Sequence, residues 1–306
     1  MLIVDGHLDL AMNAIQFNRD LTATVPQIRE SERPSREKGR ACNTVAFPEM
    51  HQGEVMISFA TLIARTAHAT NSYVGYRTQQ ICHAVAMSHL AYYELLERQG
   101  FMRILKDWPA VQEHVREWKE TQASTDAPKT ATTDPAANAA TVASATTPST
   151  TMTSTVARPP LGAVISMEGA DPITSPDEVP FWWDRGLRLL GLAHYGVSTY
   201  AHGTGTEGGL LGEAKALLKA MEETGMILDL THLADQSFWE ALEHFGGPVH
   251  ASHCNCRALV NDQRQLSDDM IRAVVERGGV IGVVFDMWML QPDWVHWVPF
   301  NLDFSA

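Results

Sequence analysis

The chain has 306 residues, of which 45% are hydrophobic, and its formal net charge at pH 7 is −13. This length and composition allow one large buried core or two small ones. Because the balance is acidic and Lys and Arg form no cluster, the sequence argues against a nucleic-acid partner.

The sequence also indicates where in the cell the protein is expected. No apolar run reaches the length of about 18 residues that a membrane span requires. The first residues lack the basic and long apolar regions of a signal peptide. The four cysteines (Cys42, Cys82, Cys254 and Cys256) show no disulfide-framework spacing. We therefore expect a reducing, cytoplasmic setting.

Short apolar runs and helix-like stretches alternate along the chain, which is typical of α/β proteins with a parallel sheet. The expected strands are residues 2–4, 54–64, 162–167, 186–193, 226–230, 248–252 and 279–285. The expected helices are residues 73–99, 210–224, 236–245 and 268–277, the last with Ser267 as its N-cap. This order predicts a TIM-like (β/α) barrel of which seven of the eight strands are identifiable.

A low-complexity stretch interrupts the predicted barrel. Residues 121–160 consist mainly of Ala, Thr, Ser and Pro and contain no Leu, Ile, Phe or Trp. Such a segment cannot bury enough apolar surface to offset its ordering entropy, so we expect a disordered insertion. The barrel is thereby divided into residues 1–120 and 161–290, and residues 291–306 are expected to form a short irregular tail.

Several of the apolar runs end in residues that bind metal ions. His7 and Asp9 follow the first run, and Glu168, His194, His232 and His253 each end a later run. Because side chains alternate along a strand, His7 and Asp9 point the same way. Imidazole and carboxylate groups together suit a divalent metal ion such as that of zinc, manganese, cobalt or iron.

Taken together, the segments 5–9, 167–169, 192–194, 229–232 and 252–259 resemble the membrane dipeptidase (renal dipeptidase) family of zinc peptidases. The resemblance runs in the same order from residue 2 to about residue 290 and implies a barrel of the metal-dependent hydrolase type. It also implies two zinc ions per chain. By matching motifs, His7 and Asp9 would bind one ion, His232 and His253 the other, and Glu168 would bridge them.

The same resemblance implies how a substrate is bound. His194 would donate a hydrogen bond to the oxyanion of the tetrahedral intermediate. Arg264 would pair with the carboxylate of the substrate, a task that suits the guanidinium fork; the family has Arg-Asn where this chain has Arg264 and Gln265. The implied function is zinc-dependent hydrolysis of dipeptides or similar small amides, with a homodimer as a candidate assembly.

One family motif has no match in this chain. Family members continue to an eighth strand that ends in Gly-(small)-Asp-(hydrophobic)-Asp-Gly, and its first aspartate assists catalysis. Asp303 lacks the flanking glycines, so this role is not transferred to it, and activity could be impaired.

Two alternatives to this function stay open. One is a truncated, catalytically weak or inactive metal-binding paralogue, and the other is a hydrolase of the same fold that acts on a lactam or deaminates a base. Asp229 could orient His232 or be structural.

Overall fold

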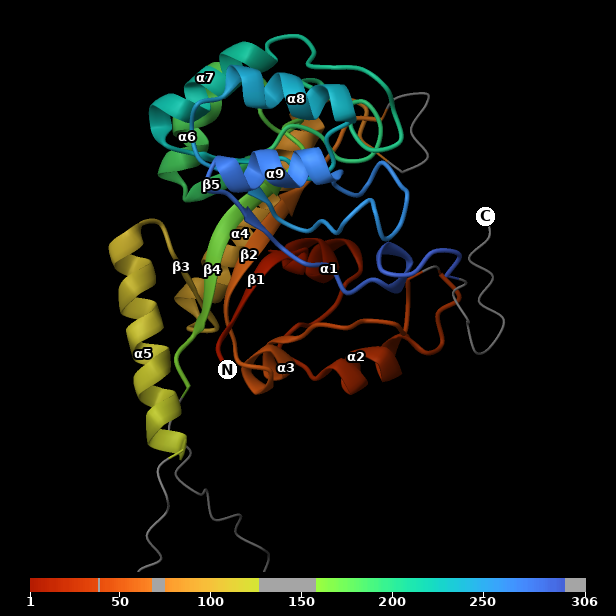
Figure 1. Ribbon diagram of the computed structural model, residues 1–306. Coiled ribbons are helices and arrows are strands. Elements are labelled where there is room, and N and C mark those ends of the chain that lie inside the picture. Colours follow the sequence, from red (N-terminus) through yellow and green to blue (C-terminus); the bar gives the residue numbers. More distant parts are fainter. Residues whose placement is uncertain (38, 68–74, 127–157, 295–306) are drawn as a thin grey trace, which may run out of the picture.

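A parallel sheet runs through the middle of the molecule (Figure 1). The computed structural model describes residues 1–37, 39–67, 75–126 and 158–294. The strands are β1 (Ile3–Leu8), β2 (Val55–Ile63), β3 (Met102–Ile104), β4 (Leu161–Glu168), β5 (Leu187–Gly191), β6 (Ile227–Asp229), β7 (Val249–Ala251) and β8 (Val280–Ile281). Their order is β1-β2-β4-β5-β6-β7-β8, every pairing is parallel, and β3 pairs with β4 beside this path.

The sheet is curled into a half-barrel. A Cβ atom added to Gly6 would lie 2.5 Å from the carbonyl oxygen of Ser252, so β1 passes close to the end of β7 near the other end of the strand order. Only a residue without a Cβ atom allows this approach. Among the described residues no strand pairing joins β8 to β1. The expected TIM-like α/β architecture is confirmed, and the seven expected strands follow one another in the expected order.

Helices follow most of the strands. They are α1 (Leu10–Gln16), α2 (Val25–Glu32), α3 (Phe47–Gln52), α4 (Gln79–Arg98), α5 (Trp108–Asp126), α6 (Val179–Asp184), α7 (Ala214–Thr224), α8 (Asp235–His244) and α9 (Asp268–Glu276), with short 3-10 helices at Pro176–Glu178 and Met287–Met289. Helices α6 to α9 gather on the side of β5, and α5 lies apart beside β3 (Figure 1). In the described part of the chain, no helix is long and apolar enough to cross a bilayer.

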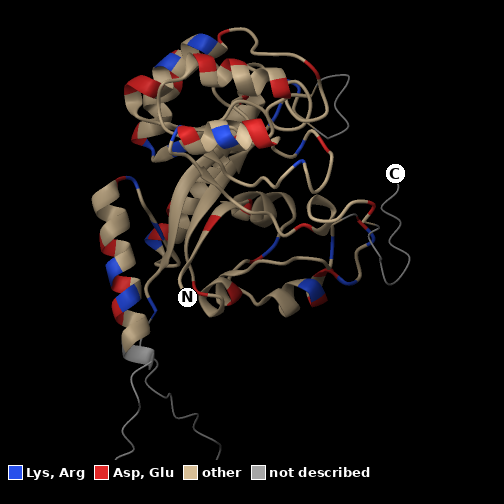
Figure 2. Ribbon diagram, viewed as in Figure 1, with Lys and Arg blue, Asp and Glu red and all other residues tan. Residues whose placement is uncertain are grey.

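The strands carry few charged residues, whereas acidic and basic residues are interspersed over the surrounding helices (Figure 2). The sheet supplies much of the core, because Leu62, Ile165, Leu190 and Leu228 are fully buried. A parallel sheet covered by helices buries both of its faces, which explains why its strands read as nearly continuous apolar runs.

The last expected strand is shorter than the sequence indicates. It was expected over residues 279–285, but β8 ends at Ile281. Beyond that point the side chain of Asn255 takes the place of a neighbouring strand: its Oδ1 accepts from Val284 N at 3.0 Å and its Nδ2 donates to Val284 O at 2.9 Å. A side-chain amide can satisfy the backbone in this way without extending the sheet.

Other element boundaries also differ. The helix expected over residues 73–99 begins at Gln79, where the Thr78 side chain accepts from Ile81 N. Ser267 caps α9 as expected, through Met270 N. Helix α5 continues to Asp126, past the expected start of the insertion at residue 121. The rest of that insertion up to residue 157, and residues 295–306 of the expected tail, lie outside the described residues.

Candidate metal centre

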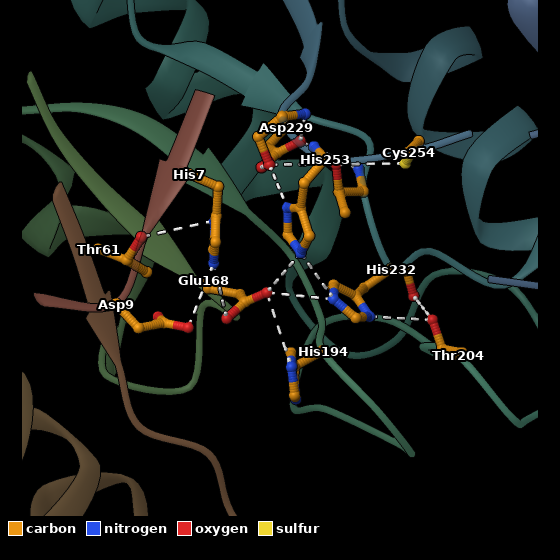
Figure 3. Close-up of polar contacts among 12 residues, drawn as sticks. His7, Asp9, Thr61, Glu168, His194, Thr204, Asp229, His232, His253 and Cys254 are labelled. Carbon is orange, nitrogen blue, oxygen red and sulfur yellow. Dashed lines mark hydrogen bonds and ion pairs between the residues drawn. The ribbon is translucent and has the colours of Figure 1, made fainter. Parts of the chain in front are cut away.

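Six side chains meet where the strands end (Figure 3). His7 lies in β1 and Glu168 is the last residue of β4, while His194, His232 and His253 follow β5, β6 and β7, and Asp9 lies between β1 and α1. Because the carboxyl ends of parallel strands meet at one edge of a sheet, residues far apart in the sequence converge there. Asp9 occupies the N-cap position of α1, but its side chain caps no backbone amide.

Glu168 lies at the centre of this group (Figure 3). Its Oε1 lies 3.1 Å from Nε2 of His232 and 3.4 Å from Nε2 of His253. Nε2 of His194 lies 3.6 Å from the same oxygen. The other oxygen, Oε2, lies 3.6 Å from Nε2 of His7. One buried carboxylate therefore faces four imidazole rings.

Two oxygen atoms of this group lack the hydrogen bonds that burial normally demands. Among the described residues, buried Oδ1 of Asp9 and Oε1 of Glu168 receive no hydrogen bond. Leaving a buried acceptor unsatisfied costs about 1–3 kcal/mol, whereas a cation would satisfy both oxygens. Oδ2 of Asp9 lies 3.5 Å from Nε2 of His7, within the same cluster. The donor set of imidazoles and carboxylates thus fits divalent metal ions.

The geometry contains two overlapping groups of ligand atoms. His7, Glu168 and His253 form one, and Glu168, His194 and His232 form the other, with the ligand atoms of each group within 4.8 Å of one another. Glu168 is common to both, as a bridging ligand would be. The division of the expected ligands between two ions stays a prediction.

Hydroxyl groups hold the far nitrogens of two of the rings. Oγ1 of Thr204 lies 3.1 Å from Nδ1 of His232 and donates its hydrogen to the carbonyl oxygen of the same residue at 3.2 Å. Oγ of Ser252 lies 2.8 Å from Nδ1 of His253 and donates to Oδ2 of Asp229 at 2.5 Å. Each hydroxyl has one hydrogen, so each must accept from Nδ1. The lone pair of each ring is therefore on Nε2, which faces Glu168.

Asp229 supports His253 and does not contact His232. Its Oδ1 accepts from the backbone nitrogens of Ser252 and Thr231, both at 3.0 Å, and its Oδ2 accepts from the Ser252 hydroxyl. Burial raises the pKa of Asp229, but the nearby His250 and His253 outweigh this and hold it below its usual value. An ionised carboxylate is thus anchored behind His253.

The pKa of His7 is shifted in the opposite direction to the pKa values of the other histidines of the cluster. Although burial disfavours the charged form of His7, the charges of Glu168 and Asp9 raise its pKa to about 9. Burial dominates elsewhere and lowers the pKa of His194 and of His253 to about 4. The pKa of Glu168 lies well below its usual value, because His194 and His7 outweigh the effect of burial.

His232 is also distinguished by its backbone. Its φ angle is +67°, in the left-handed region that few residues other than glycine adopt. Such a conformation costs about 1–3 kcal/mol and persists only where the surroundings fix it. Here the Thr204 hydroxyl bonds to both the ring and the carbonyl group of His232. The strained backbone places the ring against Glu168.

The two expected substrate-binding residues have different hydrogen-bond partners. Nδ1 of His194 accepts a hydrogen bond from Nη1 of Arg65. Arg264 is 4% exposed; it donates through Nη2 to the carbonyl oxygen of His253 at 2.7 Å and through Nη1 to Sγ of Cys254 at 3.4 Å. Each terminal nitrogen carries a second hydrogen that these bonds do not use. Substrate binding by Arg264 stays a prediction.

The sequence did not indicate several neighbours of the site. Arg65 directly follows the apolar run of β2, so the rule that selected the other strand-end residues could have found it. Ser252 directly precedes His253 in the sequence. Thr61, whose Oγ1 lies 3.5 Å from Nδ1 of His7, and Thr204 carry no such signal. A threonine in a strand or loop is too common to mark a site.

Histidines and carboxylates at the carboxyl ends of the strands of a curled (β/α) sheet lie where the active sites of such barrels are found, and they are the side chains that bind divalent metal ions. The sequence profile of the membrane dipeptidase family, peptidase family M19, matches residues 1–296. The chain therefore belongs to this family, and the resemblance seen in its motifs is confirmed.

Curated relatives match parts of the chain. An uncharacterized protein in the PQQ-III 3′ region of Acinetobacter calcoaceticus is 31% identical over 142 residues, which are 44% of this chain and 45% of that protein. An uncharacterized dipeptidase of Schizosaccharomyces pombe is 28% identical over 137 residues, which are 43% of this chain and 34% of that protein. The matches thus span less than half the length of each relative.

Two solved structures share the fold along most of this chain. One is the dipeptidase AC, a metallopeptidase of family M19, with a TM-score of 0.68, 19% identity, and coverage of 96% of this chain and 75% of that one. The other is a metallopeptidase from Rhodobacter sphaeroides bound to a phosphinate mimic of the dipeptide L-Ala-D-Ala. Its TM-score is 0.67 and its identity 18%, and the alignment covers 95% of this chain and 76% of that one. At this identity the likeness shows the fold alone.

Proposed function

We propose that this chain is a metallo-dipeptidase that hydrolyses dipeptides or similar small amides. Two zinc ions would be held by His7, Asp9, Glu168, His232 and His253. The observation that carries this proposal is the position of Glu168, a buried carboxylate with imidazole nitrogens at both oxygens. Family membership supports it, as does the dipeptide mimic bound to the metallopeptidase from Rhodobacter sphaeroides.

Each residue has a distinct part in the proposed reaction. The negative charge of Glu168 offsets the repulsion between two neighbouring cations. When bound, the cations would supply Lewis acidity that lowers the pKa of water and polarises a carbonyl group. His194 donates a hydrogen bond to the carbonyl oxygen as that oxygen gains negative charge. Arg264 pairs with the carboxylate at the end of the substrate.

Metal content and dipeptide hydrolysis, measured on the same sample of this chain, test the proposal. We expect two zinc ions per chain and turnover of a dipeptide, with loss of activity on chelation and recovery on addition of zinc. If the sample contains manganese, cobalt or iron in place of zinc, the site binds a metal other than zinc. Full activity in the metal-free protein would contradict the proposal. Two bound ions without turnover would favour the alternative of a catalytically inactive metal-binding protein.

The assembly and the cellular location are also proposals. A cytoplasmic setting is supported by the four cysteines, all of which are free thiols. Fractionation of the source cells tests this location. Light scattering of the purified chain tests the homodimer, because it gives the mass of the particle directly.

A further inference from the structure

Arg65 determines which nitrogen of His194 carries a hydrogen. Its Nη1 donates to Nδ1 of His194. A guanidinium group has hydrogen-bond donors only, so Nδ1 of His194 must be the acceptor in this contact. An imidazole ring whose Nδ1 accepts carries its hydrogen on Nε2. The Nε2–H group of His194 then faces Oε1 of Glu168, at 3.6 Å between the nitrogen and oxygen atoms.

His232 and His253 have the opposite arrangement. Their Nδ1 atoms donate to the hydroxyls of Thr204 and Ser252, whose own hydrogens are directed elsewhere. Both rings therefore present a lone pair at Nε2. A metal ion binds a nitrogen through its lone pair and cannot bind one that carries a hydrogen. Because of their partners at Nδ1, His232 and His253 can bind a metal ion through Nε2, whereas His194 cannot.

We propose that Arg65 is a positioning residue that holds His194 in its Nε2–H form, the form that the hydrogen-bond donation proposed for His194 requires. By distance alone His194 would count as a possible ligand, because its ligand atom and those of Glu168 and His232 lie within 4.8 Å of one another. The identity of the group that accepts this hydrogen bond rests on the proposed function: it is the substrate carbonyl oxygen as it gains negative charge.

Asp171 links the chain segments that carry Arg65 and His194. It is 1% exposed, and its Oδ2 accepts from the backbone nitrogen and the hydroxyl of Thr66 at 2.7 and 3.0 Å. Its Oδ1 accepts from the hydroxyl of Ser198 at 2.9 Å and from Thr199 N at 2.8 Å. The segment that follows β2 and the segment that follows β5 are thus joined through one buried carboxylate.

The ¹⁵N NMR signals of the imidazole rings test the proposal on the zinc-loaded full chain. A His194→Gln variant identifies the signals of His194. We expect a protonated Nε2 and an unprotonated Nδ1 for this ring in the wild type. Arg65→Lys keeps a group with donors only and should preserve the pattern, whereas Arg65→Leu should lose it. A protonated Nδ1 or a zinc-bound Nε2 on His194 in the wild type would overturn the proposal.

Zinc content and turnover give a second readout. Arg65→Leu should lower kcat about 10- to 100-fold and leave zinc content unchanged, and Arg65→Lys should recover most of that loss. Thr204→Val is the matched comparison, because it removes the partner of a proposed ligand and should weaken zinc binding about 10- to 100-fold. Loss of a zinc ion in both Arg65→Leu and Arg65→Lys would overturn the proposal. If the wild type neither binds zinc nor hydrolyses dipeptides, the proposed function fails, while the NMR signals of His194 in the metal-free full chain still decide its hydrogen position.

Discussion

Nε2 of His232 and Nε2 of His253 lie 3.3 Å apart (Figure 3). Neither nitrogen donates a hydrogen bond to the other. Each ring carries its hydrogen on Nδ1, where Thr204 or Ser252 accepts it. Two lone pairs at this distance repel each other. A divalent cation bound to both nitrogens would replace this repulsion with attraction, so the arrangement favours the metal-bound state.

Glu168→Gln should reduce metal binding more than any other single change in the cluster. The substitution keeps the size of the side chain but removes the charge that both groups of candidate ligands share. We expect fewer than two zinc ions per chain and a loss of dipeptide hydrolysis of at least about 100-fold. Elemental analysis and a hydrolysis assay measure both quantities.

Glu223→Gln is the matched control for this prediction. Glu223 lies on α7, its side chain is 66% exposed, and its only role in the described structure is an ion pair with Lys219 at 3.8 Å. Such a pair contributes little, so zinc content and activity should match the wild type. Normal zinc content in Glu168→Gln would show that Glu168 is not a ligand.

Metal binding should release a proton from His7. Its pKa of about 9 in the metal-free site means that the ring is protonated at neutral pH, whereas a metal ligand must be neutral. His194 and His253, with pKa values of about 4, are already neutral there. Zinc affinity should therefore rise with pH until the pH exceeds about 9.

Calorimetric titration with zinc in buffers of different ionisation heat measures this release. Near neutral pH we expect about one proton per chain beyond any released by bound water. His7→Asn should abolish that proton while leaving the second metal site partly functional. The same proton release in His7→Asn as in the wild type would assign the proton to another group.

Arg264→Gln should impair substrates that carry a C-terminal carboxylate more than substrates that carry a C-terminal amide. A charged hydrogen-bond pair contributes about 1.5–3 kcal/mol, so KM for the carboxylate substrate should rise about 10- to 100-fold. Kinetics with a dipeptide and with its amide measure the difference. If the substitution impairs both substrates equally, Arg264 does not bind the substrate carboxylate, and its role is limited to the hydrogen bond with the carbonyl group of His253.

Arg277→Gln controls for the structural part of that effect. Arg277 also donates to backbone carbonyl groups, those of Leu242, Phe245 and Gly247, but it contacts no residue of the metal cluster. It should lower the free energy of unfolding without changing the preference for a carboxylate over an amide.

Tyr93→Phe should destabilise the fold next to the site. The buried hydroxyl donates to the carbonyl oxygen of Thr61 at 2.9 Å and accepts from Ala11 N at 3.0 Å, so it joins α4 to β2 and α1. Its removal takes away both hydrogen bonds and should cost about 1–3 kcal/mol in the free energy of unfolding. Urea unfolding measures the loss. Tyr92→Phe, whose hydroxyl bonds to no described residue, should unfold as the wild type does.

Much of the fold was predictable because its signals are local. The apolar runs of β2 and β4 are long and bounded by turn residues, and both were found within two residues of their ends. The short β3 (Met102–Ile104) was missed, since three residues give no periodicity that separates a strand from a loop. The same limit applies to the end of β8, which depends on the side chain of Asn255 and not on the sequence of the strand.

The sequence by itself determined which residues meet. His7, Asp9, Glu168, His194, His232 and His253 end or follow apolar runs, and strands of one parallel sheet bring their ends together. Only the tertiary structure decided what each ring can do. The hydrogen position on a histidine depends on the partner of its Nδ1 atom, and Thr204 is 28 residues from His232 while Arg65 is 129 residues from His194. The local sequence does not predict such contacts, because they form only when the chain folds.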